Sequence, residues 1–160
     1  MIKLFTLLIF AFLSFQINAS VLDQQPEYSR VYDPQRNPFE DGHKALALAK
    51  ATDRRVMIEV GGDWCVFCHI FDRFIKSDEE VAQRFFDTFV LLKVNYSDEN
   101  ENRKFLSNFK GINGYPYIFI TENTGKVIYA NDMREMTIKG KPDKERLLSF
   151  LERWKLKKDE

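Results

Sequence analysis

The chain has 160 residues, and this length favours a single domain. Its 24 basic residues balance 24 acidic ones, which argues against nucleic-acid binding, since that function needs dense positive patches. Hydrophobic residues make up 44% of the chain and include 15 Phe, enough apolar material for a buried core. Only two cysteines are present, too few for a small scaffold held together by several disulfide bridges.

Residues 1–19 differ in kind from the rest of the chain. Lys3 precedes an apolar stretch from Leu4 to Phe15, and a small residue, Ala19, follows that stretch. This order is typical of a secretory signal peptide that is removed from the mature protein. The alternative is a membrane anchor, although the stretch is shorter than the roughly 20 residues of a membrane span. We therefore expect an exported protein, with the bacterial periplasm as its compartment.

The next segment, residues 20–38, is polar, contains three prolines and shows no hydrophobic period. We expect it to be an extended lead-in to one domain over residues 39–160. The domain opens with a predicted helix over residues 41–52, in which Asp41 is the expected N-cap. An apolar run at residues 56–60 then predicts a buried strand that ends at two glycines.

Helices and strands alternate after the two glycines. A helix is predicted over residues 65–76, and a capping-box signature at residues 77–80 predicts a short helix that ends near Phe86. The apolar run at residues 89–95 predicts a second buried strand. Residues 98–109 are predicted to form a helix with a polar outer face.

The last part of the chain predicts a hairpin and a helix. Strands over residues 117–121 and 126–130 are joined by a short Asn-Thr-Gly turn, and Pro142 is expected to open the final helix. A strand–helix–strand crossover implies a parallel pair, whereas a hairpin implies an antiparallel pair. The predicted fold class is therefore α/β, with a mixed central β-sheet flanked by helices on both faces.

Both cysteines lie in one motif, Trp64-Cys65-Val66-Phe67-Cys68, directly after the first predicted strand. This spacing places Cys65 at the start of a helix and Cys68 one turn later. Amide groups and the dipole at a helix N-terminus stabilise a thiolate. Cys65 is therefore the expected attacking sulfur of a disulfide exchange, and Cys68 the resolving sulfur. The alternative is an inert, buried pair.

The order of elements, the Trp-Cys-x-x-Cys motif and Tyr115-Pro116 before the hairpin together resemble the thioredoxin superfamily and, within it, exported domains of the DsbD type. The resemblance covers about residues 39–154. It implies a thioredoxin fold and thiol-disulfide exchange with protein cysteines. The chain departs from the family's usual dipeptides at Val66-Phe67, between the cysteines, and this departure leaves the direction of electron flow open.

Glu59 is a carboxylate inside a run of residues predicted to be buried, where it costs free energy unless it has a partner or a task. The resemblance implies an acidic residue here, beneath Cys68. Burial would raise the pKa of Glu59 and make it a proton acceptor for Cys68 near neutral pH. The alternative is a solvent-facing Glu59 without a role in the chemistry.

Four residues are expected to bind substrate. The resemblance implies that the Tyr115–Pro116 peptide bond is cis, faces the dithiol and presents the backbone of Tyr115 to an extended substrate segment. The alternative is an ordinary turn proline. Trp64 would form a flat apolar wall beside the reactive sulfur, and Phe67, inside the motif, would contact a protein partner.

The motif also matches Cys-x-x-Cys-His, the attachment pattern of c-type haem, with His69 as the axial ligand. Candidate second ligands are Met57, Met133, Met136 and His43. The preceding strand and the Tyr-Pro segment argue against haem. Zinc is disfavoured because no further ligand follows His69 at a zinc-binding spacing. A non-catalytic interaction module is a third alternative.

We therefore expect a protein thiol-disulfide oxidoreductase that acts as a reductase, with a disulfide oxidant or isomerase as alternatives. The expected catalytic residues are Cys65, Cys68 and Glu59, and the expected substrate-binding residues are Trp64, Phe67, Tyr115 and Pro116. No metal, small-molecule cofactor or nucleic acid is expected. The expected partners are substrate proteins with disulfides or thiols, and a membrane-embedded redox partner that re-reduces the cysteine pair.

Overall fold

The computed structural model describes residues 21–157, so the predicted signal peptide at residues 1–19 lies outside the described residues. Every helix within the described range is too short or too polar to span a bilayer. In chain order the elements are α1 (Glu27–Arg30), α2 (Pro38–Ala51), β1 (Arg55–Gly61), α3 (Val66–Lys76), α4 (Glu79–Thr88), β2 (Phe89–Asn95), α5 (Arg103–Leu106), β3 (Tyr117–Thr121), β4 (Val127–Asp132), the 3-10 helix η1 (Met133–Met136), β5 (Thr137–Ile138), β6 (Lys141–Pro142) and α6 (Lys144–Trp154).

Four strands form one mixed sheet in the order β2-β1-β3-β4. β1 and β2 run parallel, because α3 and α4 form the crossover between them, and Glu59 lies opposite Lys93 in this pair. β3 is antiparallel to both β1 and β4. The predicted mixed sheet with its hairpin is therefore confirmed.

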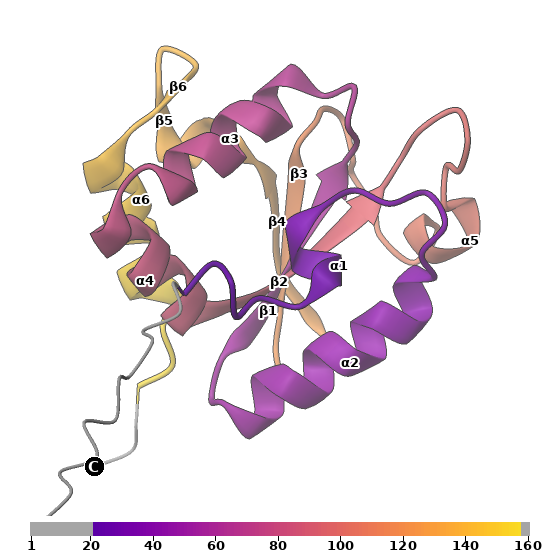
Figure 1. The fold of residues 1–160 in the computed structure, drawn as a ribbon, viewed down its shortest axis with the longest axis horizontal. Helices are drawn as coiled ribbons and strands as arrows, with labels where there is room; N and C mark the ends of the chain where they lie inside the picture. Colours follow the sequence, from indigo (N-terminus) through magenta and orange to yellow (C-terminus); the bar gives the residue numbers. More distant parts are fainter. Residues whose placement is uncertain (1–20, 158–160) are drawn as a thin grey trace, which may run out of the picture.

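Helices cover both faces of the sheet, with α2 on one side and α3, α4 and α6 on the other (Figure 1). Residues of β1 alternate between these faces, as a pleated backbone requires. Val56, Ile58 and Val60 pack in the cluster that includes α2, whereas Met57 packs in the cluster that includes α3, α4 and α6. The same alternation places Glu59 on the face covered by α3.

α2 begins earlier than the sequence predicts. Its first residue is Pro38, because the side chain of Asn37 accepts a hydrogen bond from the Phe39 amide at 3.0 Å and forms the N-cap. Asp41, the predicted N-cap, is instead buried within the helix and pairs with Arg36 at 2.7 Å. Asp41 therefore forms a partly buried ion pair with Arg36 instead of capping the helix.

The predicted helix over residues 98–109 is wrong except for the single turn α5. Asparagine side chains bind the backbone of this segment: Asn95 Nδ2 donates to the Asn100 carbonyl oxygen at 2.9 Å, and Asn102 Nδ2 donates to the Asn95 carbonyl oxygen at 2.7 Å. Asn102 also adopts a left-handed conformation with φ of 47°. Local hydrogen bonds of this kind compete with a helix and keep the segment in a loop.

The final helix also differs at its start. Pro142, the expected first residue, belongs to β6 and pairs with Thr137. Asp143 is the N-cap of α6, and its side chain accepts a hydrogen bond from the Arg146 amide at 3.0 Å. The chain therefore completes a short hairpin, β5–β6, before the helix begins.

The segment before α2 contains one helical turn, α1, where the sequence predicts an extended lead-in. Ser29 Oγ donates a hydrogen bond to the Leu91 carbonyl oxygen of β2 at 2.5 Å and anchors the segment to the sheet. Tyr28 packs in the cluster on the α2 side, whereas Tyr32 packs against the two cysteines on the α3 side. The segment therefore passes around the β2 edge from one face of the sheet to the other.

Candidate active site

Cys65 and Cys68 are joined by a disulfide at the start of α3, and their Cα atoms are 5.3 Å apart. Cys65 is the N-cap of the helix, and its Sγ accepts a hydrogen bond from the Cys68 amide at 3.2 Å. Unpaired amide groups and the helix dipole both favour negative charge at this point. After reduction, Cys65 is therefore the sulfur whose thiolate the backbone stabilises.

The chain reaches the disulfide through Gly61, the last residue of β1. A Cβ atom at Gly61 would lie 2.5 Å from Cys68 Sγ, so glycine alone lets the strand pass this close to the sulfur. Cys65 has 3% and Cys68 has 0% of its surface exposed. Gly61 thus holds the end of β1 directly against the buried sulfur of Cys68.

Glu59 lies two residues before Gly61, on the same face of β1, and is completely buried. Burial raises the pKa of Glu59 to about 7; the positive charge of Lys93 opposes this rise, and the Asp72 carboxylate adds to it. Neither carboxylate oxygen of Glu59 has a hydrogen-bond partner within residues 21–157. A carboxyl group with such a pKa can take up and release a proton near neutral pH.

The sequence prediction missed two charged residues beside Glu59. Lys93 lies opposite Glu59 in β2, and its ammonium group forms an ion pair with Asp72 of α3. Lys93 is the one charged residue in the apolar run 89–95, which is the same signal that identified Glu59. Asp72 carries no comparable signal, because it is one of several charged residues on its helix.

An aromatic cluster lies beside the disulfide. Trp64 is 52% exposed, and its Nε1 donates to the Tyr96 carbonyl oxygen at 2.6 Å. The rings of Trp64 and Tyr115 meet edge to face with centroids 5.3 Å apart, and Tyr115 stacks on Tyr96 at 5.2 Å. Tyr115 also packs against the two cysteines, and the Tyr115–Pro116 peptide bond is cis. Tyr96 was not predicted, because a tyrosine after a strand carries no functional signal.

The two residues between the cysteines are largely exposed, Val66 at 66% and Phe67 at 58%. Phe67 lines a cavity of about 240 Å³ together with Pro116 and Met133. This arrangement puts an apolar surface next to the disulfide, where a side chain of a bound protein segment could be buried.

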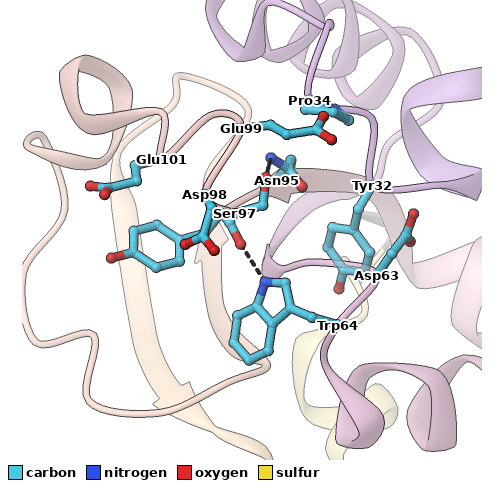
Figure 2. Close-up of a pocket in the computed structure, with 10 residues that line it drawn as sticks. Tyr32, Pro34, Asp63, Trp64, Asn95, Ser97, Asp98, Glu99 and Glu101 are labelled. Carbon is cyan, nitrogen blue, oxygen red and sulfur yellow. Dashed lines mark hydrogen bonds between the residues drawn. The ribbon is translucent and has the colours of Figure 1, made fainter.

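A second cleft, of about 450 Å³, lies next to Trp64 (Figure 2). Figure 2 shows that the Trp64 Nε1 hydrogen bond joins the motif to the loop after β2 at one end of this cleft. The cleft is lined by four carboxylates: Asp63, Asp98, Glu99 and Glu101. The surface beside the disulfide is therefore acidic near Trp64 and apolar near Phe67.

The haem hypothesis requires both sulfurs for thioether bonds and His69 as a ligand. In the structure the two sulfurs bond to each other, and His69 Nε2 donates a hydrogen bond to the Asp63 carbonyl oxygen at 2.7 Å. Three of the candidate second ligands, Met57, Met133 and Met136, are packed in the hydrophobic core. His43, on α2, is exposed. This arrangement favours a redox-active dithiol over a haem attachment site.

Comparison with known sequences agrees with this geometry. The chain is 34% identical over 79 residues to "Thiol:disulfide interchange protein DsbD" of Citrobacter koseri and 33% identical over 84 residues to the protein of that name in Yersinia enterocolitica. These alignments cover 49% and 52% of this chain. The chain spans only 14% of the length of each of these relatives.

Solved structures share the fold. A disulphide isomerase from Xylella fastidiosa Temecula1 aligns with a TM-score of 0.63 at 19% identity, over 76% of this chain and 94% of that chain. The oxidised DsbD c-terminal domain of Neisseria meningitidis aligns with a TM-score of 0.55 at 16% identity, over 74% of this chain and 97% of that chain.

The family comparison extends over most of the sheet and the motif. A family model described as "Thioredoxin-like" matches residues 38–122, which is just over half of the chain and runs from the start of α2 to the end of β3. The matched residues include the Cys65–Cys68 disulfide at the start of α3. The chain belongs to the thioredoxin-like family.

Proposed function

We propose that this protein is an exported thiol-disulfide oxidoreductase that reduces disulfides in other proteins. The observation that carries the proposal is the position of Cys65, whose sulfur accepts the Cys68 amide hydrogen bond at the start of α3. This environment favours the thiolate, which is the attacking species in disulfide exchange. The buried Glu59, with a pKa of about 7, supplies a proton acceptor for the second sulfur.

The reaction follows from these groups in two steps. The Cys65 thiolate attacks one sulfur of a substrate disulfide, so that a mixed disulfide forms and the other substrate sulfur leaves as a thiolate. Cys68 then gives its proton to Glu59, and the resulting thiolate attacks Cys65 Sγ. The Cys65–Cys68 bond forms, and the second substrate sulfur leaves and is protonated. The substrate gains two electrons, and the protein loses two.

Substrate binding is proposed for the residues that surround the disulfide. Tyr115 and the cis-bonded Pro116 are the proposed backbone pairing site for an extended segment. Phe67 and the apolar cavity beside it are proposed to take a side chain of that segment, while Trp64 shields the mixed disulfide from water. Two largely exposed apolar residues in the motif support a protein rather than a small thiol as substrate.

Reduction is the proposed direction because the dipeptide between the cysteines, Val66-Phe67, lacks the histidine found in oxidants of this superfamily. A reductase outside the cytoplasm needs a source of electrons. We therefore include in the proposal a membrane-embedded donor that re-reduces the disulfide, and export to the bacterial periplasm by the signal peptide at residues 1–19.

The reduction potential tests this proposal. The mature protein is equilibrated with glutathione buffers, and the fraction of Cys65–Cys68 disulfide is measured by thiol alkylation. A reductase is expected to show a potential near that of thioredoxin, about −270 mV, whereas a value near about −120 mV would identify an oxidant. A value near about −180 mV, as for protein disulfide isomerase, would favour the isomerase alternative. In the Cys65→Ser control the Cys65–Cys68 disulfide cannot form, so this variant must show no equilibrium between dithiol and disulfide.

A further inference from the structure

Tyr32 lies in the segment before α2, outside the family-matched residues 38–122, yet it packs in the same cluster as both cysteines. The side chain is almost fully buried, with 3% of its surface exposed. Its hydroxyl group has no hydrogen-bond partner within residues 21–157. A buried hydroxyl without a partner costs free energy, so its placement beside reactive groups calls for an explanation.

The hydroxyl of Tyr32 lies beside the buried sulfur, at the end of the strand that carries Glu59. A Cβ atom at Gly61 would be 2.9 Å from the Tyr32 hydroxyl oxygen and 2.5 Å from Cys68 Sγ, so both atoms occupy one small space at the end of β1. Burial raises the pKa of the Tyr32 phenol well above its usual value, and the negative charge of Glu59 adds to this rise. In return, the Tyr32 hydroxyl lowers the pKa of Glu59.

The position of Tyr32 is fixed from three sides. Before it, Ser29 anchors the chain to β2 through the 2.5 Å hydrogen bond to the Leu91 carbonyl oxygen. After it, the Pro34 carbonyl oxygen accepts a hydrogen bond from Asn100 Nδ2 at 2.8 Å. The ammonium group of Lys93 lies 4.6 Å from the centroid of the Tyr32 ring. The ring is therefore held by contacts that do not involve its hydroxyl group.

Charged groups from two neighbouring elements act on Glu59, whereas β3 places the apolar Ile118 opposite it. Lys93 faces it from β2, and Asp72 and Lys76 act on it from α3. Because Lys93 also pairs with Asp72, it compensates the Glu59 carboxylate only in part. Tyr32, by contrast, is a neutral group that acts on the pKa of Glu59. A hydroxyl at this position can donate a hydrogen bond to the ionised carboxylate without bringing in a further charge.

We propose that Tyr32 is a positioning residue: in the reduced protein its hydroxyl, which is unpaired among the described residues in the disulfide form, donates its hydrogen to the Glu59 carboxylate. This hydrogen bond keeps Glu59 ionised and thereby able to accept the Cys68 proton. The inference rests on the proposed function, because it concerns the step in which Cys68 resolves the mixed disulfide. In that step the proton leaves Cys68 Sγ and binds a Glu59 oxygen, and the Cys68 electron pair forms the bond to Cys65 Sγ. The N-terminal segment is thus part of the active site.

The test is the pH dependence of the resolving step in the Tyr32→Phe variant. Reduced protein is mixed with oxidised glutathione, and the second phase, in which Cys68 releases glutathione from Cys65, is followed from pH 5 to pH 9. Phenylalanine keeps the ring over Lys93 and removes only the hydroxyl. We expect the midpoint of the pH profile to rise by about 0.5–1 unit, so that the variant is about three- to tenfold slower below the wild-type midpoint.

Two controls separate this role from packing and from failure of the proposed function. Tyr28→Phe changes a buried tyrosine of the same segment on the opposite face of the sheet and is expected to leave the profile unchanged. In a Glu59→Gln background, Tyr32→Phe is expected to have no further effect. A Tyr32→Phe profile that superimposes on the wild type, or a shift that persists in Glu59→Gln, would overturn the role of Tyr32. A wild-type protein without a second phase would instead contradict the proposed function.

Discussion

Glu59 and Lys93 are charged residues on adjacent strands, and they lie opposite each other inside the protein. A buried carboxylate is costly unless its charge is compensated. Lys93 also pairs with Asp72, so burial dominates and the pKa of Glu59 rises from 4.5 to about 7. Between these two values the folded protein binds more protons than the unfolded chain, so its stability falls as the pH rises.

This linkage predicts the behaviour of Glu59→Gln. The oxidised wild type is expected to lose on the order of 2–3 kcal/mol between pH 5 and pH 8 through Glu59 alone, and the variant should lack this loss because glutamine does not titrate. Urea unfolding of both proteins at the two pH values measures the difference. The disulfide stays intact, so the thiols do not contribute. Equal pH dependence in the two proteins would contradict the raised pKa.

Residues differ in how far the sequence reveals their role. Cys65, Cys68 and Glu59 were singled out because a Cys-x-x-Cys motif or a charge in an apolar run is visible locally. Lys93 could have been found by the same rule. Tyr32 could not, because its place beside the cysteines depends on a segment that passes around the sheet edge, and no local pattern encodes that path.

At the scale of elements, the sequence predicted the strands better than the helix ends. The four strands of the sheet match their predicted ranges within about two residues. Apolar runs mark the buried strands β1, β2 and β3, whereas the Asn-Thr-Gly turn marks the start of the more exposed β4. The starts of α2 and α6 were misplaced because single side chains, Asn37 and Asp143, form the N-caps. α5 was overestimated because the side chains of Asn95 and Asn102 donate hydrogen bonds to the loop backbone instead.

The segment that contains α1 depends on one buried hydrogen bond to β2. Ser29→Ala removes the donor to the Leu91 carbonyl oxygen and is expected to cost about 1–2 kcal/mol, since a buried acceptor loses its partner. Hydrogen exchange should become faster in residues 26–36, while the amides of β1 stay protected. The matched control, Ser149→Ala on the exposed side of α6, should change neither quantity. Uniform loss of protection across the sheet would show that Ser29 supports the whole fold instead.

For the molecule as a whole, the site is assembled from parts of the chain that are far apart in sequence. The N-terminal segment supplies Tyr32, the β1–α3 junction supplies the disulfide, and the approach to β3 supplies Tyr115. Apolar and acidic surfaces flank the disulfide, near Phe67 and near Trp64 respectively. In the proposed function, a protein substrate would contact both surfaces, whereas a small disulfide would contact only the cysteine sulfur.

This difference predicts a selective effect of Phe67→Ser. Reduction of a protein disulfide should slow by about five- to tenfold, because an exposed apolar contact worth about 1 kcal/mol or more is lost. Reduction of a small aromatic disulfide should change by less than about twofold. Val127→Ser serves as the control, because Val127 is exposed and pairs with Thr121, at the end of β3 away from Pro116. Equal slowing with both substrates would argue against a partner-binding role for Phe67.

β2 is the outermost strand on its side of the sheet, yet all seven of its residues are buried. The N-terminal segment runs along this edge strand, and Ser29 Oγ donates a hydrogen bond to its Leu91 carbonyl oxygen. An uncovered, apolar edge strand is a template for pairing with another chain. Proteolytic loss of the segment would therefore do more than disturb the redox centre, because it would let two molecules join strand to strand and begin to aggregate.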